Sequence, residues 1–312
     1  MSASSKKGTG MHDATVARPA TTRRAAAAPG RPFWRMILGR LLRHPTGRIG
    51  CVFVGLIVAG AILAPLIAPA GPLVQARGQE LSGFSLAHPF GTDEFGRDIL
   101  SRVLYGARLS IGISLLAVLS GAIVGAALGI IAGYLGGTVD AVVARLLDVL
   151  LAFPAILLGI GVAAIFGTGV RGIVVAIGIA SVPDFARIAR AAAISERERD
   201  YIAAAHAIGA SPGRIMRRHV LPNVVPPLLI QLSVALSFAV LLEAGLSFLG
   251  LGIQPPQPSW GGMLQVARTY LYQVPSYTVV VGVALSILLI GFNFIADALR
   301  DILDPRLNRE LR

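Results

Sequence analysis

Residues 109–133 read LSIGISLLAVLSGAIVGAALGIIAG, within an interval of 31 uncharged residues between Arg108 and Asp140. A helix that crosses the apolar core of a bilayer needs ~20 such residues, so this stretch predicts a membrane-spanning helix. Its glycines recur at every fourth position, at 121, 125, 129 and 133. A stripe of small residues lets two helix backbones approach closely, and it predicts packing against another helix. Glycine is also common in membrane helices generally, which is the plainer explanation.

The whole chain has the composition of a membrane protein. Of its 312 residues, 54% are hydrophobic and 14% are charged, and the mean hydropathy is +0.72. A soluble domain carries roughly a quarter charged residues. Four more uncharged intervals of 22 to 28 residues are long enough to cross a bilayer, and a weaker segment has 12 uncharged residues from Gly172 to Pro183. The single cysteine, Cys51, excludes an intramolecular disulfide.

The basic residues predict the number and orientation of the spans. The net charge is +12, and ten of the 28 basic residues precede the first apolar run. Inner segments of membrane proteins carry an excess of Lys and Arg, so the basic C-terminal end belongs on the same side and the number of crossings is even. Six spans place 22 of the 28 basic residues inside. The predicted fold is an all-α membrane protein with both termini cytoplasmic and spans at 49–69, 109–133, 145–166, 170–189, 226–250 and 277–298.

The inner loop between the fourth and fifth spans, about residues 187–222, is the most informative segment. It carries seven arginines yet is rich in alanine, a strong helix former. Gly209 suits the position after a helix, Ser211 an N-cap and Pro212 the first residue of the next helix. The pattern predicts a helix, a tight turn and a short helix. We favour a rigid protrusion that docks into a partner over a plain connecting loop, and over a DNA-binding helix-turn-helix, which membrane anchoring would keep from a major groove.

The spacing within this loop resembles a known family. Ala204-Ala205, Gly209 and Leu221-Pro222 match the loop of permease subunits of binding-protein-dependent ABC importers, in which Glu-Ala-Ala, three residues, Gly, nine residues and a hydrophobic-x-Leu-Pro ending follow in order. Other stretches resemble the dipeptide/oligopeptide/nickel branch and its C-type permease: GTDEFGRD at 91–98, SRVLYGAR at 101–108, LSFLGLG at 246–252 and Trp260-Gly261. The likeness runs from about residue 33 to Arg306.

The resemblance implies a subunit that forms half of the path of an ATP-driven importer, with di- or oligopeptides as the expected solute. The implied partners are a second homologous permease in a heterodimer, two cytoplasmic ATPase subunits, an extracytoplasmic solute-binding protein and the lipid bilayer of a bacterial or archaeal plasma membrane; no nucleic acid is expected. The residues that it places in the ATPase-docking loop are Ala203, Ala204, Ala205, Gly209, Ser211, Pro212, Arg214, Leu221 and Pro222.

Two positions depart from the family pattern. Ala203 stands where the family has glutamate, and His219 stands where it has an aliphatic residue. The missing carboxylate removes one ion pair with a partner, and exposed ion pairs contribute only ~0 to 1 kcal/mol. Docking is therefore expected to depend more on shape and on the arginines.

The chain lacks the motifs of an enzyme. It has no Gly-x-x-x-x-Gly-Lys-Ser/Thr sequence for phosphate binding, and its five histidines are scattered over different segments. We expect no ATP site, cofactor or metal in this subunit. A secondary carrier is the main alternative, although carriers usually bury several ionisable groups at mid-membrane. An intramembrane enzyme is a weaker one, opposed by the missing catalytic constellations.

A few charged residues lie in or beside the predicted spans. Glu243 falls inside the fifth, and both a place in the translocation path or its gate and a buried structural hydrogen bond fit it. Helical spacing predicts a shared face for Arg145 and Asp148 and a pair between Asp98 and Arg102.

The expected division of the chain follows from these assignments. It comprises a disordered basic tail (1–32), a segment with the first span (33–76), an external loop with an interfacial helix (77–107), an ABC type-1 permease core (108–298) and a cytoplasmic tail (299–312).

Overall fold

The computed structural model describes residues 33–303. Most of these residues are helical, and loops connect the helices. The predicted basic tail, 1–32, and residues 304–312 of the predicted C-terminal tail lie outside the described residues. In chain order the elements are α1 (Phe33–Leu41), α2 (Pro45–Ile62), α3 (Ala64–Ile67), α4 (Ile99–Leu135), α5 (Gly137–Leu151), α6 (Ala155–Phe166), α7 (Val170–Arg197), α8 (Asp200–Ala207), α9 (Pro212–Ile215), the π-helical turn η1 (Met216–Val220), α10 (Leu221–Phe248), α11 (Trp260–Ala267) and α12 (Pro275–Leu303).

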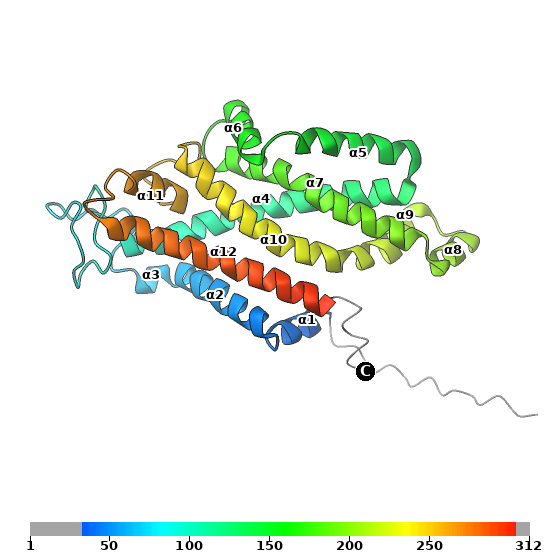
Figure 1. The fold of residues 1–312 in the computed structure, drawn as a ribbon, viewed down its shortest axis with the longest axis horizontal. Helices are drawn as coiled ribbons and strands as arrows, with labels where there is room; N and C mark the ends of the chain where they lie inside the picture. The colour runs from blue at the N-terminus through cyan, green and yellow to red at the C-terminus, as the bar shows by residue number, and fades with distance from the viewer. Residues whose placement is uncertain (1–32, 304–312) are drawn as a thin grey trace, which may run out of the picture.

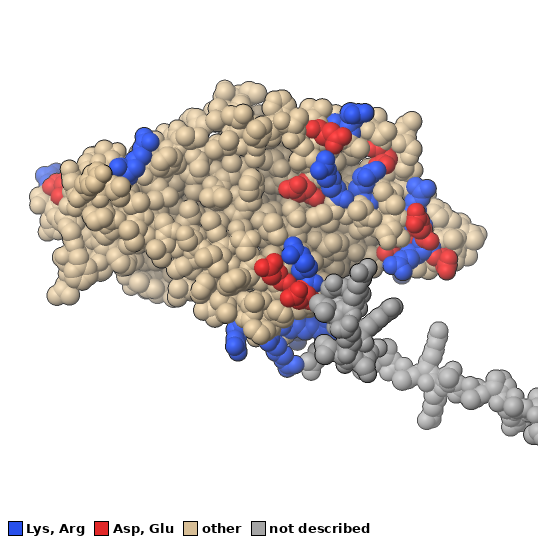
Figure 2. All heavy atoms as spheres, in the orientation of Figure 1, with Lys and Arg blue, Asp and Glu red and all other residues tan. Residues whose placement is uncertain are grey.

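The long helices lie side by side along the long axis of the molecule (Figure 1). Within 33–303, five stretches are long and apolar enough to cross a membrane: α2, α4, α7, the continuous run Pro212–Phe248 and α12. The bent pair of α5 and α6 makes a sixth candidate. Figure 2 shows a broad band without charged side chains between a few at the left end and a larger group over the right half, as an apolar bilayer core requires. The all-α fold is therefore confirmed, with five candidate spans and a sixth if the bent pair crosses as one.

The third span differs from the prediction. We expected one helix over 145–166, but α5 and α6 meet at an angle of 91°. The break falls at Ala152–Pro154, where Pro154 lacks an N–H and disfavours helical geometry at the preceding Phe153. The first half begins already at Gly137, because Gly136 adopts a φ of +69° and ends α4 there.

The expected separate interfacial helix within 77–107 is also different in the structure. Residues 99–107 are the first turns of α4, which has 37 residues. At ~1.5 Å per residue this helix is ~55 Å long, whereas the apolar core is ~30 Å thick. Helix α4 is therefore longer than a crossing requires, and its first turns form one rigid extension of the span at the end that the basic residues predict to be outer.

The glycine stripe of α4 packs against α7, as the small-residue pattern predicts. A β-carbon at Gly121 would lie 2.4 Å from the carbonyl oxygen of Gly178, and one at Gly129 would lie 2.2 Å from that of Ala186. Gly125 and Gly133 make the same kind of approach farther along α7. These two helices thus form a close-packed pair that supports the elements at the end carrying α8, which the basic residues predict to be the inner end.

The first helix, α1, was not expected from the sequence. Ile37 and Leu41 are buried in a cluster with Ala298 and Leu299 of α12, while Leu38 and Leu42 are exposed. One apolar side therefore rests on the inner end of α12. Figure 1 shows α1, α8 and the end of α12 toward the same end of the molecule.

Candidate functional site

Helix α8 lies at the inner tip of the molecule, where α7 extends to Arg197 rather than ending near 189. Ile202 and Ala205 are buried and hold α8 against the inner ends of α4 and α7. Ala203 and Ala204 are exposed. Of the three alanines in the motif, one therefore anchors the helix and two face outward.

The turn after α8 has the geometry expected for Gly209. Its φ is +79°, the N–H of Gly209 donates to the His206 carbonyl (2.9 Å), and the N–H of Ala210 donates to the Ala205 carbonyl (3.1 Å). This is the Schellman arrangement that ends helices with a left-handed residue. A β-carbon at Gly209 would meet nothing within 4 Å, so the constraint is the backbone conformation and not space.

Ser211 and Pro212 begin the next helix as predicted, with one difference. Pro212 occupies the first turn of α9, but the Ser211 side chain makes no capping hydrogen bond. The backbone carbonyl of Ser211 accepts instead from the N–H groups of Arg214 (3.0 Å) and Ile215 (3.1 Å).

The expected short helix is not separate, because α9 continues through η1 into α10. The N–H of Leu221 donates to the carbonyl of Met216, five residues back. Pro222 has no N–H and, in a regular α-helix, would clash with the carbonyl four residues before it. The wider π-helical turn just before Pro222 accommodates it, and such turns are frequent at functional sites. The tip is thus continuous with a spanning helix.

Side chains that the sequence reasoning missed brace this tip. The Tyr134 hydroxyl lies 3.0 Å from Nε2 of His206 with the two rings stacked, and Nη1 of Arg197 donates to the Tyr134 carbonyl (3.1 Å). On the other side, Nδ2 of Asn223 donates to the Tyr201 hydroxyl (3.2 Å). These residues are up to 72 positions apart, so no local spacing could have revealed them.

The outermost side chain of the tip is Ile208, which is 85% exposed and directly precedes Gly209. With Ala203 and Ala204 it gives α8 an apolar outer face. Such a face at the end of a braced protrusion suits insertion into a partner's groove.

At the opposite end, the GTDEFGRD stretch folds around one buried carboxylate. Asp93 accepts hydrogen bonds from the backbone N–H groups of Phe95 (3.0 Å) and Arg97 (2.9 Å). It also pairs with the guanidinium Nε atoms of Arg97 (2.6 Å) and Arg102 (3.1 Å), and its side chain is fully buried. Gly91 and Gly96 adopt φ values of +83° and +72° in the same loop. Residues 91–98 therefore form a rigid loop, here called the outer platform, and its construction explains the motif.

Two further details of the platform concern charge. Asp98 caps α4 by accepting from the Ser101 N–H (2.7 Å) and lies 3.0 Å from Nδ1 of His88, so the expected Asp98–Arg102 pair is wrong. The buried Asp93 carboxylate is the nearer partner for Arg102. Burial, and then the negative charge of Asp93, raises the pKa of the Glu94 carboxyl above its usual value.

Arg145 and Asp148 lie three positions apart in α5 and so share a face as expected, but the ion pairs of this region join two helices. Asp148 of α5 pairs with Arg187 of α7 (3.1 Å), and Asp140 pairs with Arg190. In the described part of the chain Arg145 forms no ion pair. Arg187 and Arg190 lie three positions apart on the same side of α7, and each pairs with one of the two carboxylates.

Glu243 is fully buried where α4, α10 and α11 meet. Its Oε1 accepts from the Ser247 hydroxyl (2.8 Å). The Ser110 hydroxyl of α4 accepts from the Trp260 N–H of α11 (3.3 Å). Within the described residues Oε2 of Glu243 has no partner. The structural hydrogen bond weighed from the sequence is therefore present, and a place in the path stays a prediction.

Comparison with known families identifies what this architecture is. Residues 125–309 match the family described as "Binding-protein-dependent transport system inner membrane component". Residues 32–89 match the "N-terminal TM domain of oligopeptide transport permease C". The chain belongs to the permeases of binding-protein-dependent ABC importers. This permease is a membrane component of such a system and not its catalytic subunit.

Curated relatives of the permease cover nearly its whole length. It is 40% identical over 274 residues to the dipeptide transport system permease protein DppC of Alkalihalophilus pseudofirmus, covering 88% of this chain and 90% of that one. A putative peptide transport system permease protein of Brucella abortus is 43% identical over 275 residues, covering 87% and 91%. The glutathione transport system permease protein GsiD of Escherichia coli is 40% identical over 280 residues, covering 89% and 91%.

Solved structures confirm the fold of the permease. A chain of the MetNI methionine ABC transporter, crystallised in inward-facing conformations, matches with a TM-score of 0.54 at 20% sequence identity. The match covers 65% of the permease and 97% of that chain.

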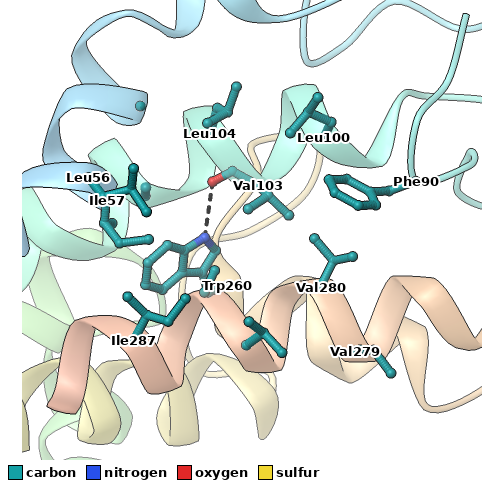
Figure 3. Close-up of a pocket in the computed structure, with 14 residues that line it drawn as sticks. Leu56, Ile57, Phe90, Leu100, Val103, Leu104, Trp260, Val279, Val280 and Ile287 are labelled. Atoms are coloured by element: carbon teal, nitrogen blue, oxygen red, sulfur yellow. Dashed lines mark hydrogen bonds between the residues drawn. The ribbon is translucent and has the colours of Figure 1, made fainter. Parts of the chain in front are cut away.

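The outer half of the permease holds an apolar groove of about 540 Å³ between α2, α4 and α12 (Figure 3). Trp260 forms part of its wall and donates its indole N–H to the Val103 carbonyl (3.0 Å). The residues that line it are all apolar. A charged or strongly polar solute would find no partner there, so we do not place the solute path in this groove.

Proposed function

We propose that the permease carries di- or oligopeptides and pairs with a second homologous permease as a heterodimer. Two cytoplasmic ATPase subunits drive the transporter, and they bind it through α8. The relatives named for dipeptide, peptide and glutathione transport support the solute class. Measuring which solutes bind to its solute-binding protein, with di- and oligopeptides, glutathione and chelated nickel compared, tests that assignment.

One observation carries the mechanism. The tip formed by α8, the Gly209 turn and α9 is braced against α4 and is continuous with the spanning helix α10. A tip fixed in this way moves as a rigid body, so closure of the ATPase pair would tilt α10 instead of bending a loop. The docking surface that we propose contains Ala203, Ala204, Ala205, Gly209, Ser211, Pro212, Arg214, Leu221 and Pro222, with Ile208 added; of these, Ala205 is buried and supports the surface from below.

We also propose that both termini are cytoplasmic and that residues 33–76 and 108–298 are the N-terminal segment and the permease core. The 22 basic residues on the predicted inner side support this orientation. The described ends of the chain, α1 and the end of α12, lie toward the same end as α8 (Figure 1).

Gly209→Val will uncouple the transporter. A β-branched residue at a φ of +79° is strained by about 1 kcal/mol or more, and relief of that strain re-aims α9. We expect normal insertion and pairing with the second permease, but loss of most ATPase co-purification and of substrate-stimulated ATP hydrolysis in vesicles.

Gly39→Val is the matched control for that test. Gly39 lies in α1, outside the docking surface, has no positive φ, and a β-carbon there would also meet nothing within 4 Å. If the Gly209→Val transporter retains wild-type ATPase co-purification and substrate-stimulated ATP hydrolysis, the tip only connects two helices and does not couple the ATPase to the permease.

We propose that Glu243 lies at the outer gate. Of the three helices that enclose it, α4 and α10 are spans and α11 lies at the outer end. Gln retains the hydrogen bond from Ser247 while removing the charge. We expect Glu243→Gln to assemble and melt like the wild type but to take up solute severalfold more slowly, with an altered pH profile. Wild-type uptake at every pH would remove this role.

A further inference from the structure

A second apolar groove lies on the inner half of the permease, between α4 and the run from α9 into α10. Its volume is about 590 Å³. One wall is the side of α4 that faces away from the glycine stripe, from Leu119 to Ile131. The other wall is made by Gly213, Met216, Leu221 and Leu228.

The inner end of this groove opens into a basic hollow of about 570 Å³. Ser211, Gly213, Arg214, Arg217 and Arg218 line the hollow, and Gly213 and Arg217 belong to both spaces. The three arginines are exposed, and none of them forms an ion pair with any residue between 33 and 303. An apolar slot therefore ends in three guanidinium groups that are free to bind an anion.

The dimensions fit the inner leaflet of a membrane. From Leu119 to Ile131 the wall spans 12 residue steps of ~1.5 Å, or ~18 Å along α4. Half of the ~30 Å apolar core is ~15 Å. The arginines lie past the inner end of this wall, at the level where phosphate groups of inner-leaflet lipids are found.

We propose that this groove binds one anionic phospholipid of the inner leaflet, with the phosphate on Arg217 and Arg218 and an acyl chain along α4. Guanidinium groups match phosphate oxygens in both charge and geometry. The leaflet assignment rests on the cytoplasmic placement of α8 proposed above, whereas lipid binding itself does not. Met216, in the π-helical turn, forms part of the wall, so a bound lipid contacts the link between tip and span.

Native mass spectrometry of the assembled transporter in detergent tests the proposal. After delipidation, phosphatidylglycerol and phosphatidylcholine with identical acyl chains are added back in turn. We expect tight retention of phosphatidylglycerol, and roughly 30-fold weaker retention by the Arg217→Gln/Arg218→Gln double variant, at about 1 kcal/mol for each basic residue. Ala127→Trp, which fills the exposed groove wall without changing charge, should lose it as well.

The control variant Arg43→Gln/Arg48→Gln removes the same charge from exposed residues at the inner end of α1 and α2. It should retain phosphatidylglycerol like the wild type. Equal retention of the two lipids, or equal loss in both double variants, would overturn the proposal. These readouts need neither solute nor ATP, so they can fail while the transport function stands.

A photoreactive amino acid in place of Ile131, a large exposed side chain of the same wall, shows which molecule occupies the groove in membranes. We expect adducts with phospholipid. Adducts with the second permease or with the ATPase would show that a protein partner fills the groove and would overturn the lipid assignment.

Discussion

Gly129→Leu will prevent the permease from accumulating as a folded protein. A β-carbon at this position lies 2.2 Å from the carbonyl oxygen of Ala186 and 2.8 Å from the β-carbon of Ala189. Overpacking a core with side chains that can adjust costs about 1 to 3 kcal/mol, and here the opposing group is backbone, which cannot rotate away. The expected loss is therefore at or above the upper end of that range, with α4 and α7 forced apart.

Gly112→Leu is the matched control, because Gly112 lies in the same helix and is exposed with open space around it. Yield by fluorescence-detected size exclusion and the melting temperature in detergent are the measurements. If both variants accumulate and melt alike, α4 and α7 do not pack through the glycine stripe.

Asp93→Ala will have the second large effect, at the outer end. The carboxylate is fully buried between Arg97 and Arg102, whose side chains are each only 7% exposed. Removing one member of a buried ion pair leaves an uncompensated charge and typically costs 3 to 5 kcal/mol. We expect a strong drop in yield and melting temperature, partly restored by Asn, which can still accept from the two backbone N–H groups.

Asp148→Ala removes an ion pair of the opposite kind. Asp148 and Arg187 are 55% and 57% exposed, so their pair is worth ~0 to 1 kcal/mol and its loss should change the melting temperature little. A similar melting temperature for Asp93→Ala and Asp148→Ala would show that the platform is not built on its buried charge.

The sequence predicted the spans well because their signal is one-dimensional. A bilayer imposes a minimum apolar length, so counting uncharged residues located α2, α4, α10 and α12. The span of α7 has a shorter uncharged stretch and was placed by the even number of crossings that the basic residues require. The glycine stripe also predicted close packing, but its period says nothing about which helix provides the other side. That Gly121 meets Gly178 is a matter of tertiary structure.

The predictions that failed relied on local spacing where distant partners compete. Asp98 had an arginine four positions away, yet it caps a helix. The face that Asp148 shares with Arg145 did not reveal its partner either, because Asp148 pairs with Arg187 of α7. The bend at Pro154 was hidden because proline carries no charge and does not interrupt an uncharged interval. Within the docking loop, Gly209 and Pro212 were found because turn chemistry is local. Its bracing by Tyr134 was not, because that contact spans 72 positions.

The central claim is that the α8 tip is the surface through which ATPase subunits drive this permease. A photoreactive amino acid at Ile208, which is 85% exposed at the tip, measures this directly in the assembled transporter, and Tyr272, 99% exposed at the opposite end, is the matched position. Cross-links from residue 208 to the ATPase subunit, with none from residue 272, are the predicted result. ATPase adducts from residue 272, or their absence from residue 208 in a transporter that hydrolyses ATP, would contradict it.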